Sequence, residues 1–178
     1  IFFLSMKLKL IQIKINEIYK IVYNKFIDKR GSFQRLFCNK DIGKLKFNLK
    51  QINLSKNKTK GTFRGLHYQS KLKEKKIIKV LKGEIILYLV NINLKSKNYL
   101  KMKKIKISEK DNFLIYVTKD YATAYFTLKN NTEILYFMSN YYSPKHSKGI
   151  NYKDPKIKLK LPFEPKVISK KDREWKNL

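Results

Sequence analysis

The most constraining feature of this sequence is a succession of short runs in which apolar and polar residues alternate with a period of two. Such runs, separated by polar breaks such as Lys82-Gly83 and Asn130-Asn131, are typical of β-strands. We expect strands over Lys9–Ile15, Ile18–Ile27, Lys46–Ile52, Thr62–Tyr68, Ile77–Leu81, Ile85–Ile92, Met102–Ile107, Phe113–Val117, Tyr121–Leu128 and Glu133–Met138. About ten short strands in 178 residues predict an all-β sandwich or barrel, and this number fits a jelly roll.

Short helical segments are expected to flank these strands. Asn39–Leu45 reads as a short turn, and Ser169–Trp175 begins with a serine cap and carries Asp172. Ile85–Val90 is continuously apolar, which indicates a strand buried on both faces or one at a subunit interface. No linker or repeat divides the chain, so we expect one domain over residues 1–178, with residues 1–5 read from upstream of a start at Met6.

The chain carries 42 Lys and Arg residues against 13 Asp and Glu, a formal charge of +29. Nucleic-acid-binding proteins concentrate cations in one stripe or tail and favour Arg for phosphate and base contacts. Here the lysines are spread along nearly the whole sequence, and only four basic residues are Arg. We therefore attribute most of the charge to solvated lysines and expect no nucleic-acid partner. Nucleic-acid binding remains an alternative, which would appear as tight duplex binding with a steep salt dependence.

Cysteine and histidine are too scarce for several common kinds of site. The single cysteine, Cys38, excludes an internal disulfide, and two histidines, His67 and His146, make a protein-built metal site unexpected. No apolar run approaches the roughly 20 residues that span a bilayer. The first apolar run is too short for the core of a signal peptide. We therefore expect no metal, no membrane partner and a cytoplasmic location.

His67 is the first candidate for chemistry. It follows Arg64 by three positions, and residues three apart on a regular strand point to opposite faces. Gly65 must therefore kink or bulge the strand if both side chains are to reach one pocket. A carboxylate such as Asp172 would fix the tautomer of His67 and raise its basicity, as a general base requires. Taken alone, His67 also fits a structural histidine, and Asp172 fits a charge in the first turn of a helix.

A series of short motifs extends over the chain from Phe26 to Trp175. In chain order these are Asp28-Lys29-Arg30-Gly31-Ser32-Phe33, Gln51-Ile52-Asn53-Leu54-Ser55, residues 60–69 (KGTFRGLHYQ), Lys76 with Gly83-Glu84, Leu135-Tyr136, Tyr141-Tyr142-Ser143-Pro144 and residues 168–173 (ISKKDR). The series resembles the dTDP-4-dehydrorhamnose 3,5-epimerase family, whose patterns include D-x-R-G-x-F, Q-x-N-x-S and K-G-T-x-R-G-L-H-Y-Q. The resemblance implies a cupin-type double-stranded β-helix, a jelly roll with short flanking helices. It also implies a homodimer in which active sites borrow strands from the partner.

The resemblance further implies an isomerase that needs no cofactor and inverts C3, C5 or both in a dTDP-linked 4-keto-6-deoxy sugar, as in dTDP-L-rhamnose biosynthesis. His67 would be the base held by Asp172, and Lys76 would stabilise the enolate at the C4 oxygen. Tyr136 would return a proton on the opposite face. The residues expected to bind the nucleotide sugar are Arg30, Arg64, Gln51, Asn53 and, more weakly, Tyr141.

The sequence departs from the family pattern in two places. Where the family has I-P-x-G-F-A-H-G-F, this chain has residues 117–125 (VTKDYATAY), with Thr123 at the position of the histidine. Leu87 and Asn91 replace acids of the family's G-x-[VI]-x-D-V-x-V-D strand. These changes favour a changed sugar preference. They also leave open a 3,4-ketoisomerase, which product NMR would reveal, and a catalytically impaired nucleotide-sugar-binding cupin.

Overall fold

The computed structural model describes residues 7–13 and 18–178, and the regular secondary structure in these residues is almost entirely β-strand. The strands are β1 (Lys9–Gln12), β2 (Tyr19–Val22), β3 (Lys25–Asp28), β4 (Gly31–Gln34), β5 (Gln51–Asn57), β6 (Thr62–Gln69), β7 (Lys76–Lys82), β8 (Glu84–Asn91), β9 (Met102–Ser108), β10 (Phe113–Val117), β11 (Tyr121–Thr127), β12 (Thr132–Met138), β13 (Ser147–Gly149) and β14 (Val167–Ile168). The helical elements are the 3₁₀ turn η1 (Gly43–Leu45) and the one-turn helix α1 (Lys170–Arg173). Among the described residues, no helix has the length and apolarity needed to cross a membrane.

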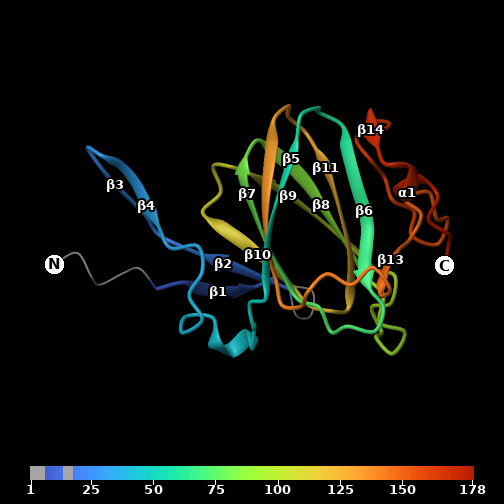
Figure 1. The fold of residues 1–178 in the computed structure, drawn as a ribbon, viewed down its shortest axis with the longest axis horizontal. Helices are drawn as coiled ribbons and strands as arrows, with labels where there is room; N and C mark the ends of the chain where they lie inside the picture. The colour runs from blue at the N-terminus through green and yellow to red at the C-terminus, as the bar shows by residue number, and fades with distance from the viewer. Residues whose placement is uncertain (1–6, 14–17) are drawn as a thin grey trace.

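Two sheets face each other as a jelly roll (Figure 1). The first sheet has the strand order β1-β2-β10-β7-β12-β5, and the second has the order β13-β6-β11-β8-β9. Neighbouring strands are antiparallel, except that the short β14 pairs in parallel with β6. The all-β jelly roll expected from the alternating pattern is therefore confirmed.

Three apolar clusters stabilise this arrangement. The central cluster lies between the sheets and includes Ile78, Val80, Leu87 and Leu89. A second cluster joins the segment around η1 to the first sheet. A third joins the C-terminal segment to the second sheet. The two faces that point away from the centre are thus also covered by the chain, and Figure 1 shows the C-terminal segment lying against β6.

Most of the predicted strands are confirmed, but two boundaries are wrong. The range Ile18–Ile27 divides into β2 and β3: the Tyr23 N–H still bonds to the Asn112 carbonyl in the register of β2 and β10, and the chain then leaves the sheet to form the separate hairpin. The range Lys46–Ile52 is mostly not a strand. Lys46 has a left-handed backbone (φ 46°) and Phe47 docks on the outer face of the first sheet, so β5 starts only at Gln51.

The remaining predictions are resolved as follows. Part of Lys9–Ile15 forms β1, whereas residues 14–15 lie outside the described residues. The predicted turn at 39–45 contains η1, and α1 begins after Ser169, whose hydroxyl accepts from the Asp172 N–H at 3.1 Å. The apolar run Ile85–Val90 lies in β8 and is buried within this chain, so it supplies no free subunit interface.

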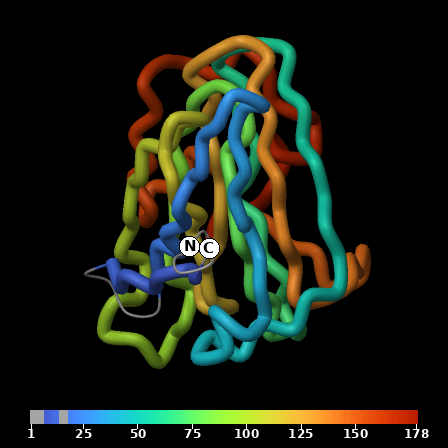
Figure 2. Tube along the Cα trace, turned by 90° about the vertical axis from the view of Figure 1, so that its left-hand side faces the viewer, coloured from blue at the N-terminus to red at the C-terminus, as the bar shows by residue number. Residues whose placement is uncertain are grey.

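A separate hairpin of β3 and β4 stands away from the two sheets (Figures 1 and 2). These two strands pair only with each other in the described part of the chain. Figure 2 shows the blue hairpin in front of the body when it is viewed from the side of the first sheet. Its large apolar side chains Ile27 and Phe33 are 76% and 63% exposed.

Candidate active site

Two adjoining cavities open between the strands of the jelly roll. The larger has a volume of about 490 Å³ and extends from β6 to the segment around α1. The smaller has a volume of about 260 Å³ and lies between the two sheets, with Leu87 in its apolar wall. Four side chains line both cavities: Arg64, His67, Lys76 and Met138. Three of these are predicted site residues, so the sequence motifs converge on one place.

A bulge in β6 brings Arg64 and His67 to the same cavities. Thr123 of β11 pairs with His67 and Tyr125 pairs with Arg64, so β6 advances three residues while β11 advances two. Gly65 lies inside this irregular step with φ +134°, and an added Cβ would stand 2.3 Å from the Cβ of Ala124. Only glycine fits there without displacing β11. The prediction that Gly65 must bulge the strand is confirmed.

His67 and Asp172 form a tight pair across the second sheet and the C-terminal segment. The Nε2 atom of His67 lies 2.7 Å from Oδ1 of Asp172. The His67 side chain is 42% exposed and the Asp172 side chain is 5% exposed, so the imidazole faces the opening while its partner is buried. Because Nε2 is paired with Asp172, Nδ1 is the ring nitrogen that can exchange a proton with a bound molecule.

Three donors converge on the carboxylate of Asp172. Besides His67, the backbone N–H of Gly65 donates to Oδ2 at 3.3 Å and the indole of Trp175 donates to Oδ1 at 3.2 Å. Burial acts to raise the pKa of Asp172, but the hydrogen bonds from these groups and the attraction of His67 outweigh it and lower the pKa below its usual value. The residue is therefore an anion that orients His67.

Tyr136 stands on the opposite wall of the smaller cavity. It belongs to β12 in the first sheet, between Asn53 of β5 and Ile78 of β7, whereas His67 belongs to the second sheet. Burial raises the pKa of Tyr136 well above its ordinary value, the nearby phenol of Tyr125 raises it further, and Arg64 opposes the change. The phenol is thus held in its protonated form, able to give a proton to a molecule in the cavity.

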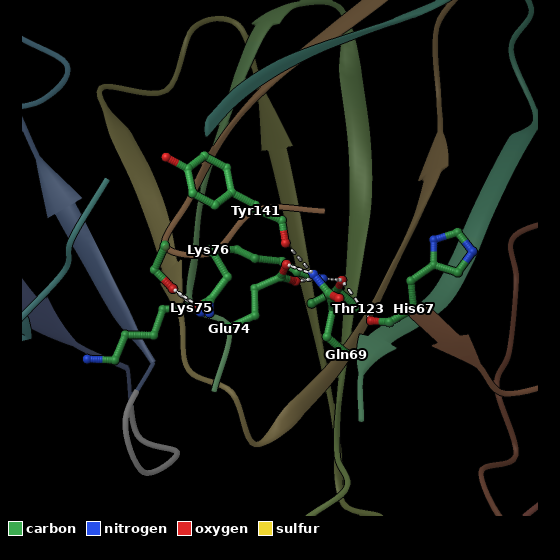
Figure 3. A network of polar contacts seen from close by, with 9 residues as sticks. His67, Gln69, Glu74, Lys75, Lys76, Thr123 and Tyr141 are labelled. Atoms are coloured by element: carbon green, nitrogen blue, oxygen red, sulfur yellow. Dashed lines mark hydrogen bonds and ion pairs between the residues drawn. The ribbon is translucent and has the colours of Figure 1, made fainter. Parts of the chain in front are cut away.

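Lys76 is the first residue of β7 and lines both cavities. Figure 3 shows its side chain within a network of polar contacts. Its Nζ lies 3.3 Å from Oε1 of Glu74 and donates to the hydroxyl of Thr123 at 3.1 Å. The side chain is 12% exposed. An ammonium group held in a mostly dry wall is suited to stabilise negative charge on a bound molecule.

The predicted binding residues are only partly brought together. Arg64 donates from Nε to the Asn57 side chain at 3.2 Å and lines both cavities. Asn53 lines the smaller cavity and accepts from the Gln51 amide at 2.8 Å. The Oε1 atom of Gln51 accepts a hydrogen bond from the backbone N–H of Tyr142. Tyr141 is 67% exposed and is not in the lining, whereas its neighbour Tyr142 lines the larger cavity.

Arg30 lies far from this group, in the turn of the β3–β4 hairpin. Its side chain is 89% exposed and pairs with Asp28 at 2.7 Å. It lines neither of the two cavities. Within one chain, therefore, the structure does not bring Arg30 to the cavities that His67 lines. Figure 1 shows the β3–β4 hairpin well away from β6.

Sequence reasoning missed two polar residues of the cavities. Glu74 is buried beside Lys76, and the Tyr125 hydroxyl bonds to Ser55 and Asn57 at 2.9 Å each. A signal for Glu74 was present, since it is the one acidic residue between His67 and Glu84 in a strongly basic chain. Tyr125 gives no local signal, because an aromatic residue in an apolar strand reads as core.

Comparisons with known proteins agree with this geometry. The profile of the family described as dTDP-4-dehydrorhamnose 3,5-epimerase matches residues 12–178. A dTDP-4-dehydrorhamnose 3,5-epimerase of Sinorhizobium fredii is 30% identical over 175 residues, which cover 93% of this chain and 87% of the relative. The chain belongs to this family.

Solved structures give the same result. A Bacillus anthracis dTDP-4-dehydrorhamnose 3,5-epimerase with TDP and pyrophosphate bound superimposes with a TM-score of 0.90 at 27% identity, covering 96% of this chain and 99% of that chain. A Legionella pneumophila dTDP-6-deoxy-D-glucose-3,5-epimerase in complex with dTDP-4-keto-L-rhamnose superimposes with a TM-score of 0.89 at 29% identity, covering 96% of this chain and 92% of that chain.

Proposed function

We propose that this chain is an active epimerase that inverts C3, C5 or both in a dTDP-linked 4-keto-6-deoxy sugar. One observation carries the proposal: a histidine paired with a buried carboxylate and a protonated tyrosine face the same cavity from opposite sheets. Inversion of a carbon requires that a proton leave one face and return to the other. A base and an acid on opposite walls meet that requirement.

The proposed reaction proceeds through an enolate. The C4 carbonyl acidifies the neighbouring C–H bonds, and His67 removes the proton from C3 or C5 while the electron pair moves onto the C4 oxygen. Lys76 stabilises the negative charge at that oxygen. The phenol of Tyr136 then protonates the carbon on the opposite face and the carbonyl re-forms. His67 and Tyr136 regain their starting forms by proton exchange with solvent, so no step requires a cofactor.

Solvent deuterium tests this function directly. The protein is incubated with dTDP-4-keto-6-deoxyglucose in deuterated water, and incorporation at C3 and C5 is followed by NMR. We expect deuterium at one or both carbons, and none at either carbon after His67→Ala. Binding of the nucleotide sugar without any exchange by the unsubstituted protein would instead support a binding protein, the reading that Thr123 leaves open.

We further propose that Arg64, Asn53 and Gln51 hold the nucleotide sugar and that Tyr141 lies near its base. The guanidinium of Arg64 is suited to an anionic diphosphate. Its position at the junction of both cavities supports this role.

A diphosphate does not cross a bilayer unaided, and we therefore propose that the enzyme acts in the cytoplasm.

We infer that the chain forms a homodimer in which the β3–β4 hairpin carries Arg30 to the partner's site. The hairpin exposes Ile27 and Phe33, and the edge strand β5 exposes Ile52 and Leu54 at 52% and 48%. Exposed apolar groups on a hairpin and on an unpaired strand edge favour burial against another copy. Arg30 would then contact a substrate bound in the partner's cavities, although it lies far from the cavities of its own chain.

Mixing of two inactive variants tests the exchange of Arg30. Arg30→Ala and His67→Ala proteins are refolded together in equal amounts. If Arg30 serves the partner's site, half of the dimers contain one intact site, and about a quarter of the wild-type activity returns. Absence of any recovery, with heterodimers confirmed by tagged pull-down, contradicts the proposal.

A further inference from the structure

One buried acid at the cavity wall has no part in the mechanism above. Glu74 lies in the connection between β6 and β7, two residues before Lys76, and its side chain is 5% exposed. Removing a carboxylate from water is unfavourable unless it is paired and hydrogen-bonded. Glu74 meets both conditions: Oε1 lies 3.3 Å from Lys76 Nζ, and Oε2 accepts from Gln69 Nε2 at 2.6 Å.

The contacts of Glu74 extend into a chain of polar groups (Figure 3). On one side, the Gln69 amide also reaches the backbone carbonyl of Tyr141 at 3.4 Å. On the other side, Lys76 donates to Thr123, whose hydroxyl contacts the backbone carbonyl of His67 at 3.4 Å. Figure 3 shows that His67 joins this chain through its backbone, while its imidazole points away from the network.

The network fixes the direction of the Lys76 ammonium. An ammonium group has three donors and no acceptor. The Glu74 carboxylate forms an ion pair with this ammonium at 3.3 Å, and the Thr123 hydroxyl accepts a hydrogen bond from it at 3.1 Å. Donor capacity remains for a group in either of the two cavities that Lys76 lines.

We propose that Glu74 and Thr123 are positioning residues that hold the Lys76 ammonium in place against the oxygen that becomes the enolate. This inference rests on the proposed epimerase function. Glu74 acts only through Lys76 and touches no reacting atom. Thr123, which stands where the family has a histidine, here serves as the second support of the lysine.

The variant Glu74→Gln removes the charge and preserves the shape of the side chain. We expect kcat for deuterium exchange to fall about 10- to 100-fold with KM changed by less than about 3-fold, because the misplaced donor is needed most when charge develops on the oxygen. The matched control is Glu84→Gln, which breaks a 2.8 Å pair with Lys106 away from the cavities. It is expected to leave kcat unchanged. An equal loss in both variants contradicts a specific role for Glu74.

A double-mutant cycle tests whether Glu74 acts through Lys76. In a Lys76→Met background, Glu74→Gln is expected to reduce the remaining exchange by less than about 2-fold, since the group it positions is gone. If the fold-losses of the two single variants multiply in the double variant, the two residues act independently and the inference is wrong. Thr123 gives a second approach if Glu74→Gln folds poorly: Thr123→Val is expected to lower kcat, and Thr123→Ser, which retains the hydroxyl, to restore most of it.

The ammonium group can also be observed without substrate. In ¹⁵N-lysine NMR spectra, an ammonium held by two acceptors exchanges its protons slowly, and the Lys76 signal is assigned by its loss in Lys76→Arg. We expect this signal in the unsubstituted protein and its loss in Glu74→Gln. A signal that survives in Glu74→Gln contradicts the proposal. Absence of deuterium exchange in the unsubstituted protein, with the signal still dependent on Glu74, would reject the epimerase function and the catalytic purpose of the network together.

Discussion

Asp172 shows how one buried anion links activity to stability. The unfolded chain binds a proton on this carboxyl near pH 4, whereas the folded chain holds its pKa lower. The stabilisation is therefore present above about pH 4 and is lost as the pH falls through the folded value. We expect Asp172→Asn to lower deuterium exchange by about 100-fold or more, since the amide is not an anionic partner for His67.

The stability of the Asp172→Asn variant is measured by urea unfolding at pH 7 and at pH 3. The advantage of the unsubstituted protein is expected at pH 7 and should shrink at pH 3. A constant difference between the two proteins would show that the charge of Asp172 does not stabilise the fold.

Lys79 is a buried cation whose charged form the fold disfavours, whereas the fold favours the charged form of Asp172. It is 2% exposed, and its ammonium donates to the carbonyl of Asp111 at 2.6 Å. Burial lowers its pKa from 10.5 to about 8, although Asp111 opposes the change and Lys25 adds to it. Between these two values the unfolded chain holds the proton that the folded chain has released, so stability rises with pH. Relative to Lys79→Met, we expect the unsubstituted protein to gain up to about 3 kcal/mol from pH 7 to pH 10.5.

Chemical unfolding across this pH range measures the difference. Lys106→Met serves as a control, because Lys106 is 68% exposed. Parallel stability curves for the unsubstituted protein and Lys79→Met would contradict the expected release of a proton.

At the scale of elements, the bulge of β6 depends on Gly65. An alanine there would meet the Cβ of Ala124 at 2.3 Å and would also occupy a left-handed backbone at φ +134°. We expect Gly65→Ala to destabilise the protein by about 2–4 kcal/mol and to lower exchange, because Arg64 and His67 lose their common direction. Thermal unfolding gives the first effect and deuterium incorporation the second.

Gly43 provides the comparison for Gly65. It lies in η1 with no atom within 4 Å of an added Cβ, so Gly43→Ala is expected to change stability by less than about 0.5 kcal/mol. Similar losses at both positions would mean that the bulge is not the sensitive feature.

Local sequence patterns predicted those elements whose side chains alternate between a buried and a solvated face. The same patterns failed at Phe47, where alternation reflects a loop docked on a sheet, and after Tyr23, where the chain leaves the first sheet and starts a separate hairpin. For the site, the glycine beside His67 was enough to anticipate the bulge. The pairing of Glu74 with Lys76 was not anticipated, because one lysine-rich sequence does not distinguish a solvated carboxylate from a carboxylate buried against a lysine.

At the scale of the whole molecule, the charge of +29 bears on how fast an anionic substrate arrives. A strongly positive surface raises the encounter rate with a diphosphate, and salt screens it. We expect kcat/KM to fall several-fold between about 50 mM and about 500 mM NaCl while kcat stays nearly constant. Steady-state kinetics at several salt concentrations check this, and an equal fall in kcat would point to a loss of structure.

We also propose that residues 1–178 behave as one domain. The central cluster joins strands of both sheets, so unfolding one sheet would expose the apolar face of the other. Calorimetric unfolding is expected to be a single transition whose measured enthalpy equals the van't Hoff enthalpy. Two resolved transitions would show that the chain contains two domains.

The pairing of His67 with Asp172 spans 105 residues and uses a segment that follows every strand of both sheets. During translation, the strands of the jelly roll leave the ribosome before the carboxylate that completes the dyad. A nascent chain that ends before Asp172 contains every β-strand and yet lacks the anion that makes His67 a base. A premature stop codon between Ile168 and Asp172 would therefore leave the residues of every described β-strand in the encoded chain and remove the carboxylate that orients His67.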